Sequence, residues 1–263
     1  MNRIVKYNIY LFFIIYFLAC QENEVPKLCM FNIIIGEPIP ADKKVDTKLT
    51  IDCKSDQINL PARIRRRGGY SRSFHKRSFE IDLKDDLPLV NLPADDDWIL
   101  NANYIDKTFL RHTMSYELFR DMHENNEASQ CKYVEVTING KYNGLYVLME
   151  KLDKSSLSIN KKDSEAMIFK EPHIFRKSYD EFVKLFPDNL HQQTYPKIKK
   201  DNKLAAIDKV RDFILHSSDA KFKEDFKTIF DLNNIIDWHL LLLITNNSDG
   251  ILKNFVTVQC YLR

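Results

Sequence analysis

The chain has 263 residues, of which 44% are apolar and 29% are charged. This composition is ordinary for a globular protein and excludes wholesale disorder, and the length suffices for one large domain or two small lobes. The formal net charge of +2 is close to neutral and identifies no partner. There are 6 glycines, which is few for this length, so a cluster of glycines is informative.

The amino-terminal segment differs from the rest of the chain. A basic stretch precedes an apolar run at 9–19, which ends at Cys20. This pattern predicts a secretion signal, since the run is too short for a membrane span. Small Ala19 before Cys20 resembles a bacterial lipobox, which implies cleavage and lipidation of Cys20; an uncleaved signal anchor is the alternative. We expect a lipoprotein signal peptide at 1–20, a tether at 21–27, and a lipid-anchored protein of the bacterial cell envelope, periplasmic or surface-exposed.

The other cysteines leave their pairing open. Their spacings match no zinc motif, so we expect no metal site built from cysteine. An oxidising compartment would permit disulfides, and unpaired buried thiols are the alternative. The residues concerned are Cys29, Cys53, Cys131 and Cys260.

The first half of the chain reads as strands with one helix. Alternating or apolar runs predict strands over 30–35, 49–53, 62–65, 78–83, 133–138 and 145–149. Asn139-Gly140 predicts a hairpin turn between the last two. A helix is predicted over 106–122, with Asp106 as N-cap and one apolar side formed by Leu110, Met114, Leu118 and Met122.

The second half reads as helical. Helices are predicted over 204–215, 222–230 and 234–245, and a strand over 255–261 closes the sequence. The segment 234–245 is almost wholly apolar, so we expect a buried central helix. The pattern predicts a two-lobed α+β layout in one unit from about residue 27 onward.

Two segments have the composition of chemical sites. In the basic run at 65–77, the Gly68-Gly69 pair would let backbone N–H groups approach a phosphate, with an ordinary hairpin turn as the alternative. Nucleic acid is another interpretation of a basic run, but the near-neutral total charge and the expected envelope location argue against it. At the other segment, Asp249 precedes Asn254 by five residues, the spacing of a kinase catalytic loop, although a polar loop produces it by chance.

Four blocks in order resemble the CotH family: residues 64–83, 100–111, 134–153 and 246–254. The resemblance implies an atypical protein kinase fold with a β-rich N-lobe (about 28–153), one long helix and a partial helical C-lobe (about 154–263). It also implies ATP, Mg²⁺ or another divalent cation, and phosphorylation of Ser or Thr on secreted or surface proteins.

The resemblance also assigns roles to individual residues. It implies Asp249 as the catalytic residue, Asn254 as a metal ligand, and a nucleotide site formed by Arg67, Gly68, Gly69, Ser71, Lys76 and Glu150. Other residues are ambiguous: Asp106 and Arg111 also suit helix capping and an ion pair, Asp237 suits a helix start, and Lys170 suits either nucleotide contact or an exposed position.

The chain departs from the family pattern after Asn254. The nine residues that follow include neither Asp nor Glu, whereas the family continues to a second acidic motif that holds the metal. Loss of that carboxylate would slow phosphoryl transfer by orders of magnitude. We expect a truncated reading frame. The alternatives are a catalytically inactive CotH-like lipoprotein that acts in surface binding or adhesion, and an unrelated envelope lipoprotein that binds glycans or other anions.

Overall fold

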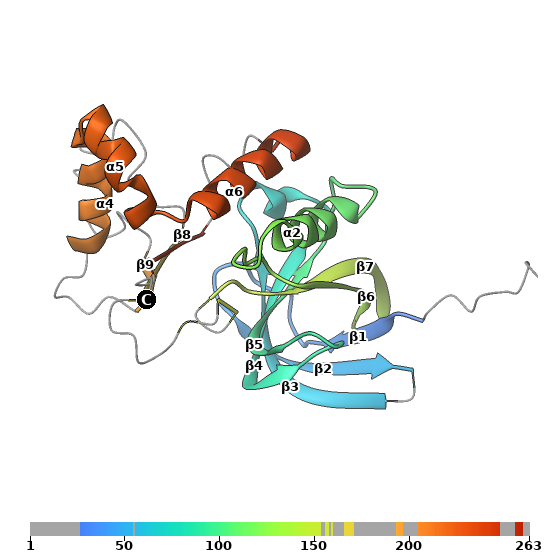
Figure 1. Cartoon of the computed structure of the whole chain (residues 1–263). Helices are drawn as coiled ribbons and strands as arrows, with labels where there is room; N and C mark the ends of the chain where they lie inside the picture. The colour runs from blue at the N-terminus through green and yellow to red at the C-terminus, as the bar shows by residue number, and fades with distance from the viewer. Residues whose placement is uncertain are drawn as a thin grey trace, which may run out of the picture.

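A computed structural model describes residues 27–54, 56–153, 156–157, 159, 166–170, 193–196, 205–247 and 256–259. Its first part is strand-rich (Figure 1) and comprises β1 (Cys29–Ile34), β2 (Val45–Cys53), β3 (Asp56–Arg67), the 3₁₀ turn η1 (Tyr70–Ser73), β4 (Ser78–Pro88), β5 (Ala94–Asn101), α2 (Leu110–Met122), β6 (Cys131–Ile138) and β7 (Lys141–Glu150). The second part comprises β8 (Met167–Lys170), β9 (Gln193–Tyr195), α4 (Ala205–His216), α5 (Asp219–Ile229), α6 (Leu232–Thr245) and β10 (Val256–Gln259).

The first seven strands form a closed barrel in the order β1-β2-β3-β4-β5-β7-β6. Neighbours are antiparallel except at the closure, where β1 lies parallel to β6 with Phe31 opposite Val136. Alternate side chains point inward and form the core, as period two requires. The largest fully buried side chains of the barrel include Phe31, Ile33, Leu49, Ile64, Ile81, Trp98, Leu100, Tyr146 and Leu148.

Two local features hold the barrel strands in register. The predicted hairpin is confirmed, because Asn139 and Gly140 join β6 to β7 with φ of 50° and 75°. Cys29 and Cys53 form a disulfide that links β1 to β2, which answers part of the pairing question. Cys131 is a free thiol, and burial raises its pKa to about 12.

Helix α2 covers the outer face of β5, β6 and β7, but not with the side predicted. Phe109 and Tyr116 pack on Ile99 and Val147, whereas Met114, on the predicted apolar side, is 59% exposed. The helix also begins four residues later than expected. The N-cap residue is Phe109 and not Asp106 as predicted, although the Asp106 carboxylate accepts the backbone N–H of Arg111 at 2.9 Å.

The carboxyl-terminal part contains the three predicted helices and a small sheet in the order β10-β8-β9. Helix α6 packs against α2, and Asn126 donates to Asp237 of α6 at 2.8 Å. The expected burial of α6 is wrong: Leu242 is its buried residue, while Leu243 and Ile244 are 64% and 69% exposed. Within the described ranges, none of the helices is both long enough and apolar enough to cross a membrane.

The predicted fold class, a two-lobed α+β kinase-like fold with a helical C-lobe, is therefore wrong. The parallel pairing of β1 with β6 closes the strands into a barrel, and the carboxyl-terminal part adds a second sheet to its helices. The local patterns predicted most strands correctly. Local patterns do not show which distant strands pair, and that pairing determines the architecture.

Candidate functional site

The predicted glycine loop opens the connection between β3 and β4, which spans residues 68–77 and contains η1. Gly68 has φ of +108°, and a Cβ at this position would clash with the Ser71 hydroxyl. Gly69 accepts a hydrogen bond from the backbone N–H of Arg72 at 3.2 Å and has open space around its Cα. Gly68 is thus required by the turn itself, whatever the turn binds.

Strand alternation sends the arginines of β3 to opposite faces. Arg65 lies on the outer face, where its Nε and Nη2 donate to Glu80 Oε2 at 2.9 and 2.6 Å. Arg67 is half-buried near Tyr116 of α2; burial lowers its pKa, and the Glu80 carboxylate opposes this shift. Arg66 lines a cavity at the end of the barrel.

Lys76 is held by groups from β7 and from the start of α2. Its ammonium donates to the Leu145 carbonyl and lies 4.3 Å from the Tyr146 ring centroid and 4.8 Å from that of Phe109. Burial, followed by the charge of Lys107, lowers the pKa of Lys76 to about 8. The group therefore remains mostly cationic at neutral pH.

Glu150 occupies a different part of β7. It is buried, and its Oε1 accepts the backbone N–H of Gln130 at 3.0 Å. Burial raises its pKa, against the effects of that hydrogen bond and of Arg120. Leu145, which contacts Lys76, precedes Glu150 by five strand residues, or about 16 Å. The glycine turn and Lys76 thus belong to one connection between β3 and β4, whereas Glu150 lies far along β7 from the residue that Lys76 contacts.

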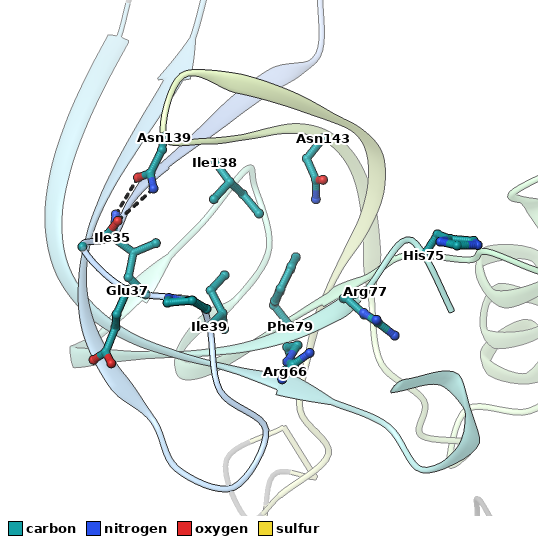
Figure 2. A pocket seen from close by; sticks show the side chains of 12 residues that line it. Ile35, Glu37, Ile39, Arg66, His75, Arg77, Phe79, Ile138, Asn139 and Asn143 are labelled. Carbon is teal, nitrogen blue, oxygen red and sulfur yellow. Dashed lines mark hydrogen bonds between the residues drawn. The ribbon is translucent and has the colours of Figure 1, made fainter. Parts of the chain in front are cut away.

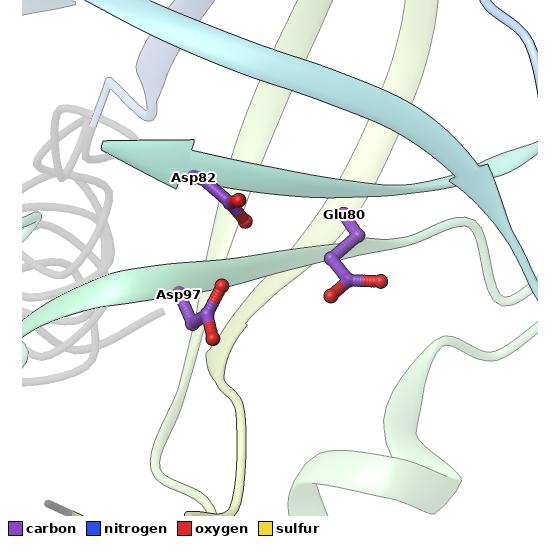
Figure 3. Close-up of side chains that lie close together, drawn as sticks. All are labelled: Glu80, Asp82 and Asp97. Atoms are coloured by element: carbon purple, nitrogen blue, oxygen red, sulfur yellow. The ribbon is translucent and has the colours of Figure 1, made fainter. Parts of the chain in front are cut away.

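Three carboxylates on the outer face of β4 and β5 form a cluster that sequence analysis missed (Figure 3). Oxygen atoms of Glu80, Asp82 and Asp97 lie within 4.8 Å of one another. Lys44 pairs with all three, at 3.1 Å from Glu80, and Lys151 lies 2.9 Å from Asp97 and 3.3 Å from Glu80. The alternating run at 78–83 already placed Glu80 and Asp82 on one face.

The charges of this cluster are balanced internally. Burial acts to raise the pKa of Glu80, but the hydrogen bond from Arg65 and the charges of Lys151 and Lys44 hold it at about 2. Burial and a hydrogen bond with Asp97 raise the pKa of Asp82. A divalent cation would have to displace lysines already paired with the carboxylates, so the cluster does not fit a resident Mg²⁺.

The remaining predicted residues fall into two groups. Asp249, Asn254 and Cys20 lie outside the described residues. Arg111 is an exposed side chain that lies 3.9 Å from Asp106, so the predicted ion pair is present. Lys170 ends β8 and is exposed.

Comparison with known proteins identifies the family. The sequence model of the family described as "CotH kinase protein" matches residues 64–258, so the chain belongs to this family. It is 25% identical over 228 residues to the inner spore coat protein H of Bacillus subtilis (strain 168). The alignment covers 83% of this chain and 57% of that protein, so the chain spans less than two thirds of its relative.

Proposed function

We propose that this protein is an exported protein kinase of the CotH family that transfers the γ-phosphate of ATP to Ser or Thr of secreted or surface proteins. The observation that carries the proposal is the family match over residues 64–258. The matched region contains the β3–β4 turn and Lys76 together with the Asp249 loop.

The nucleotide would bind at the β3–β4 turn. Phosphoryl transfer needs cations placed against the phosphates more than it needs covalent chemistry from the protein. Arg67 and Lys76 supply positive charge on either side of the turn, and Lys76 keeps its charge at neutral pH although burial lowers its pKa to about 8. Asp249 would accept the proton of the substrate hydroxyl, and Asn254 would ligate the divalent cation.

Export is supported by the disulfide between Cys29 and Cys53, since disulfides persist in oxidising compartments. Lipid attachment at Cys20 would hold the protein at the envelope membrane. Labelling with radioactive palmitate tests it: label should enter the wild-type protein and be absent from Cys20→Ser.

Nucleotide binding is tested by thermal unfolding with and without Mg²⁺-ATP. A ligand at about 100 times its Kd stabilises by about 2.7 kcal/mol, which corresponds to a rise in Tm of about 5–10 °C for a chain of this size. Lys76→Met should remove most of the rise. Lys48→Met, an exposed lysine of β2, should keep it.

Transfer is tested separately, with radiolabelled ATP and a generic protein substrate. Incorporation that disappears in Asp249→Asn would support the kinase proposal. The rival is a catalytically inactive surface-binding protein, which is favoured by the engagement of Lys76 with the Leu145 carbonyl. Nucleotide stabilisation without transfer would select that rival, and no stabilisation of a cooperatively folded chain would refute nucleotide binding.

A further inference from the structure

A cavity of about 550 Å³ opens at the end of the barrel (Figure 2). It lies where β1 ends, where the β6–β7 hairpin turns, and where the β3–β4 turn begins. Its volume is within the range of ligand pockets, about 300–1,000 Å³, and the mouth of a small barrel is a common place for such a pocket.

The inner wall of this cavity is apolar. Ile35 and Phe79 belong to the buried core of the barrel, with 7% and 3% of their surfaces exposed. Ile39 and Ile138 are half-buried and pack against the same core. A ligand that enters the mouth therefore meets the apolar interior of the barrel directly, and contact with it would be favourable.

The rim of the cavity carries positive charge. Arg66 and Arg77 line it together with His75, and Glu37 is the acidic residue among its described lining. Figure 2 shows the Glu37 carboxylate at the edge of the site, apart from the two guanidinium groups. The side chain of Asn143 adds an amide that already donates to the Tyr146 hydroxyl at 2.6 Å.

Arg66 has an unsatisfied donor at this place. Its Nε is shielded from solvent, and no acceptor among the described residues contacts it. A buried N–H group without a partner is unfavourable, and native proteins rarely leave one. An anion in the mouth would pair with the Arg66 guanidinium that lines it.

This cavity is distinct from the proposed nucleotide site. Arg66 lines it, whereas its neighbours Arg65 and Arg67 point to the outer face of β3. The same separation recurs before β4, where Arg77 lines the cavity, whereas Lys76 lies over the rings of Tyr146 and Phe109 and donates to the Leu145 carbonyl. The basic segment 65–77 thus places some of its cationic side chains at the cavity and others outside it.

We propose that the mouth of the barrel binds a small organic anion, with an apolar body against Phe79 and Ile35 and a carboxylate or phosphate head held by Arg66 and Arg77. The apolar wall selects the body and the guanidinium groups select the head. A neutral molecule with the same body would leave Arg66 unpaired.

The test is isothermal titration of the whole chain with octanoate, octyl phosphate and octanol at pH 7. At least one of the two anions should bind at least tenfold more tightly than octanol, and the tighter anion identifies the head group. Arg66→Met and Arg77→Met should each weaken that anion at least tenfold. Arg72→Met, an exposed arginine of the same hairpin, should leave it unchanged.

A second variant locates the ligand. Ile39→Trp should fill the cavity and abolish binding of the tighter anion, while Lys76→Met should not affect it, which separates this site from the nucleotide site. The melting temperature of each variant is measured first, and if Arg66→Met fails to fold, Arg77→Met and Ile39→Trp decide. The proposal is overturned if neither anion binds the folded wild-type chain at millimolar concentration, or if binding persists in Ile39→Trp.

Discussion

Replacing Glu80 by Gln measures how much the outer ion-pair network stabilises the barrel. Burial acts to raise the pKa of Glu80, yet Arg65, Lys151 and Lys44 together lower it from 4.5 to about 2. At 1.36 kcal/mol per pKa unit, this difference corresponds to about 3 kcal/mol of stability. The Glu80 side chain is only 7% exposed, so solvent screens the interaction little.

The sign of this contribution sets its pH dependence. Because the folded-state pKa is depressed, the stabilisation is fully present above pH 4.5 and is lost as the pH falls toward 2. Urea denaturation should therefore find Glu80→Gln less stable by about 3 kcal/mol at pH 7. At pH 3, one unit above the folded-state pKa, the deficit should shrink to about 1 kcal/mol.

Asp82→Asn is the matched control for this experiment. Asp82 belongs to the same cluster, but burial and its hydrogen bond with Asp97 raise its pKa. The fold therefore favours the ionised form of Asp82 less than that of Glu80, and Asp82→Asn should cost less than Glu80→Gln at pH 7. Equal losses for Glu80→Gln at pH 7 and pH 3, or a loss no larger than that of Asp82→Asn, would refute the reasoning.

Four further substitutions, of which Gly69→Ala serves as a control, test other parts of the fold by urea denaturation. Gly68→Ala should cost about 2 kcal/mol, because φ is +108° and the new methyl meets Ser71, whereas Gly69→Ala should cost less, because a Cβ there meets open space; equal effects would contradict the turn geometry. Cys53→Ser opens a disulfide that joins residues 24 apart and should cost about 3 kcal/mol. Dithiothreitol should destabilise the wild type by a similar amount and leave this variant unchanged. Leu148→Ala removes a fully buried side chain of the barrel and should cost about 2–5 kcal/mol, so a loss below about 1 kcal/mol would place the residue outside the core.

The local order of the barrel could be predicted from short patterns. Alternating side chains over 78–83 predict strand β4, and Asn139-Gly140 predicts the hairpin between β6 and β7. Strand β5 was missed because its acidic start, which includes Asp95 and Asp97, is poor strand sequence, although Trp98 and Leu100 are fully buried in it. A run of aspartates predicts a loop from sequence alone. In the structure it forms part of a strand because β4 pairs with it.

The burial of helices was harder to predict than their positions. Apolar spacing located α2 and α6, but Tyr116 rather than Met114 faces the barrel, and Leu243 is exposed. Composition shows that a helix has apolar residues. Only the neighbouring elements determine which of them are covered.

Only the part of the candidate site that lies within one segment could be predicted, because contacts between distant segments do not show in local patterns. The basic turn around Gly68 and Lys76 was visible as composition, and the two lie in one hairpin. The contacts of Lys76 with Leu145 and Phe109 depend on segments far away in sequence, and so does the pairing of Glu80 with Lys151. No spacing rule within one segment could supply them.

The parallel closure of the barrel has a practical consequence for work on this protein. The family match begins at residue 64, whereas β1, β2 and most of β3 precede it. A polypeptide cut to 64–258 would leave β6 without β1 and the remaining end of β3 without β2, and it would lack Phe31 and Leu49. Its two open edges would invite pairing between copies and aggregation. The stretch that marks the family is therefore shorter than the stretch that folds, and expression should begin upstream of Cys29.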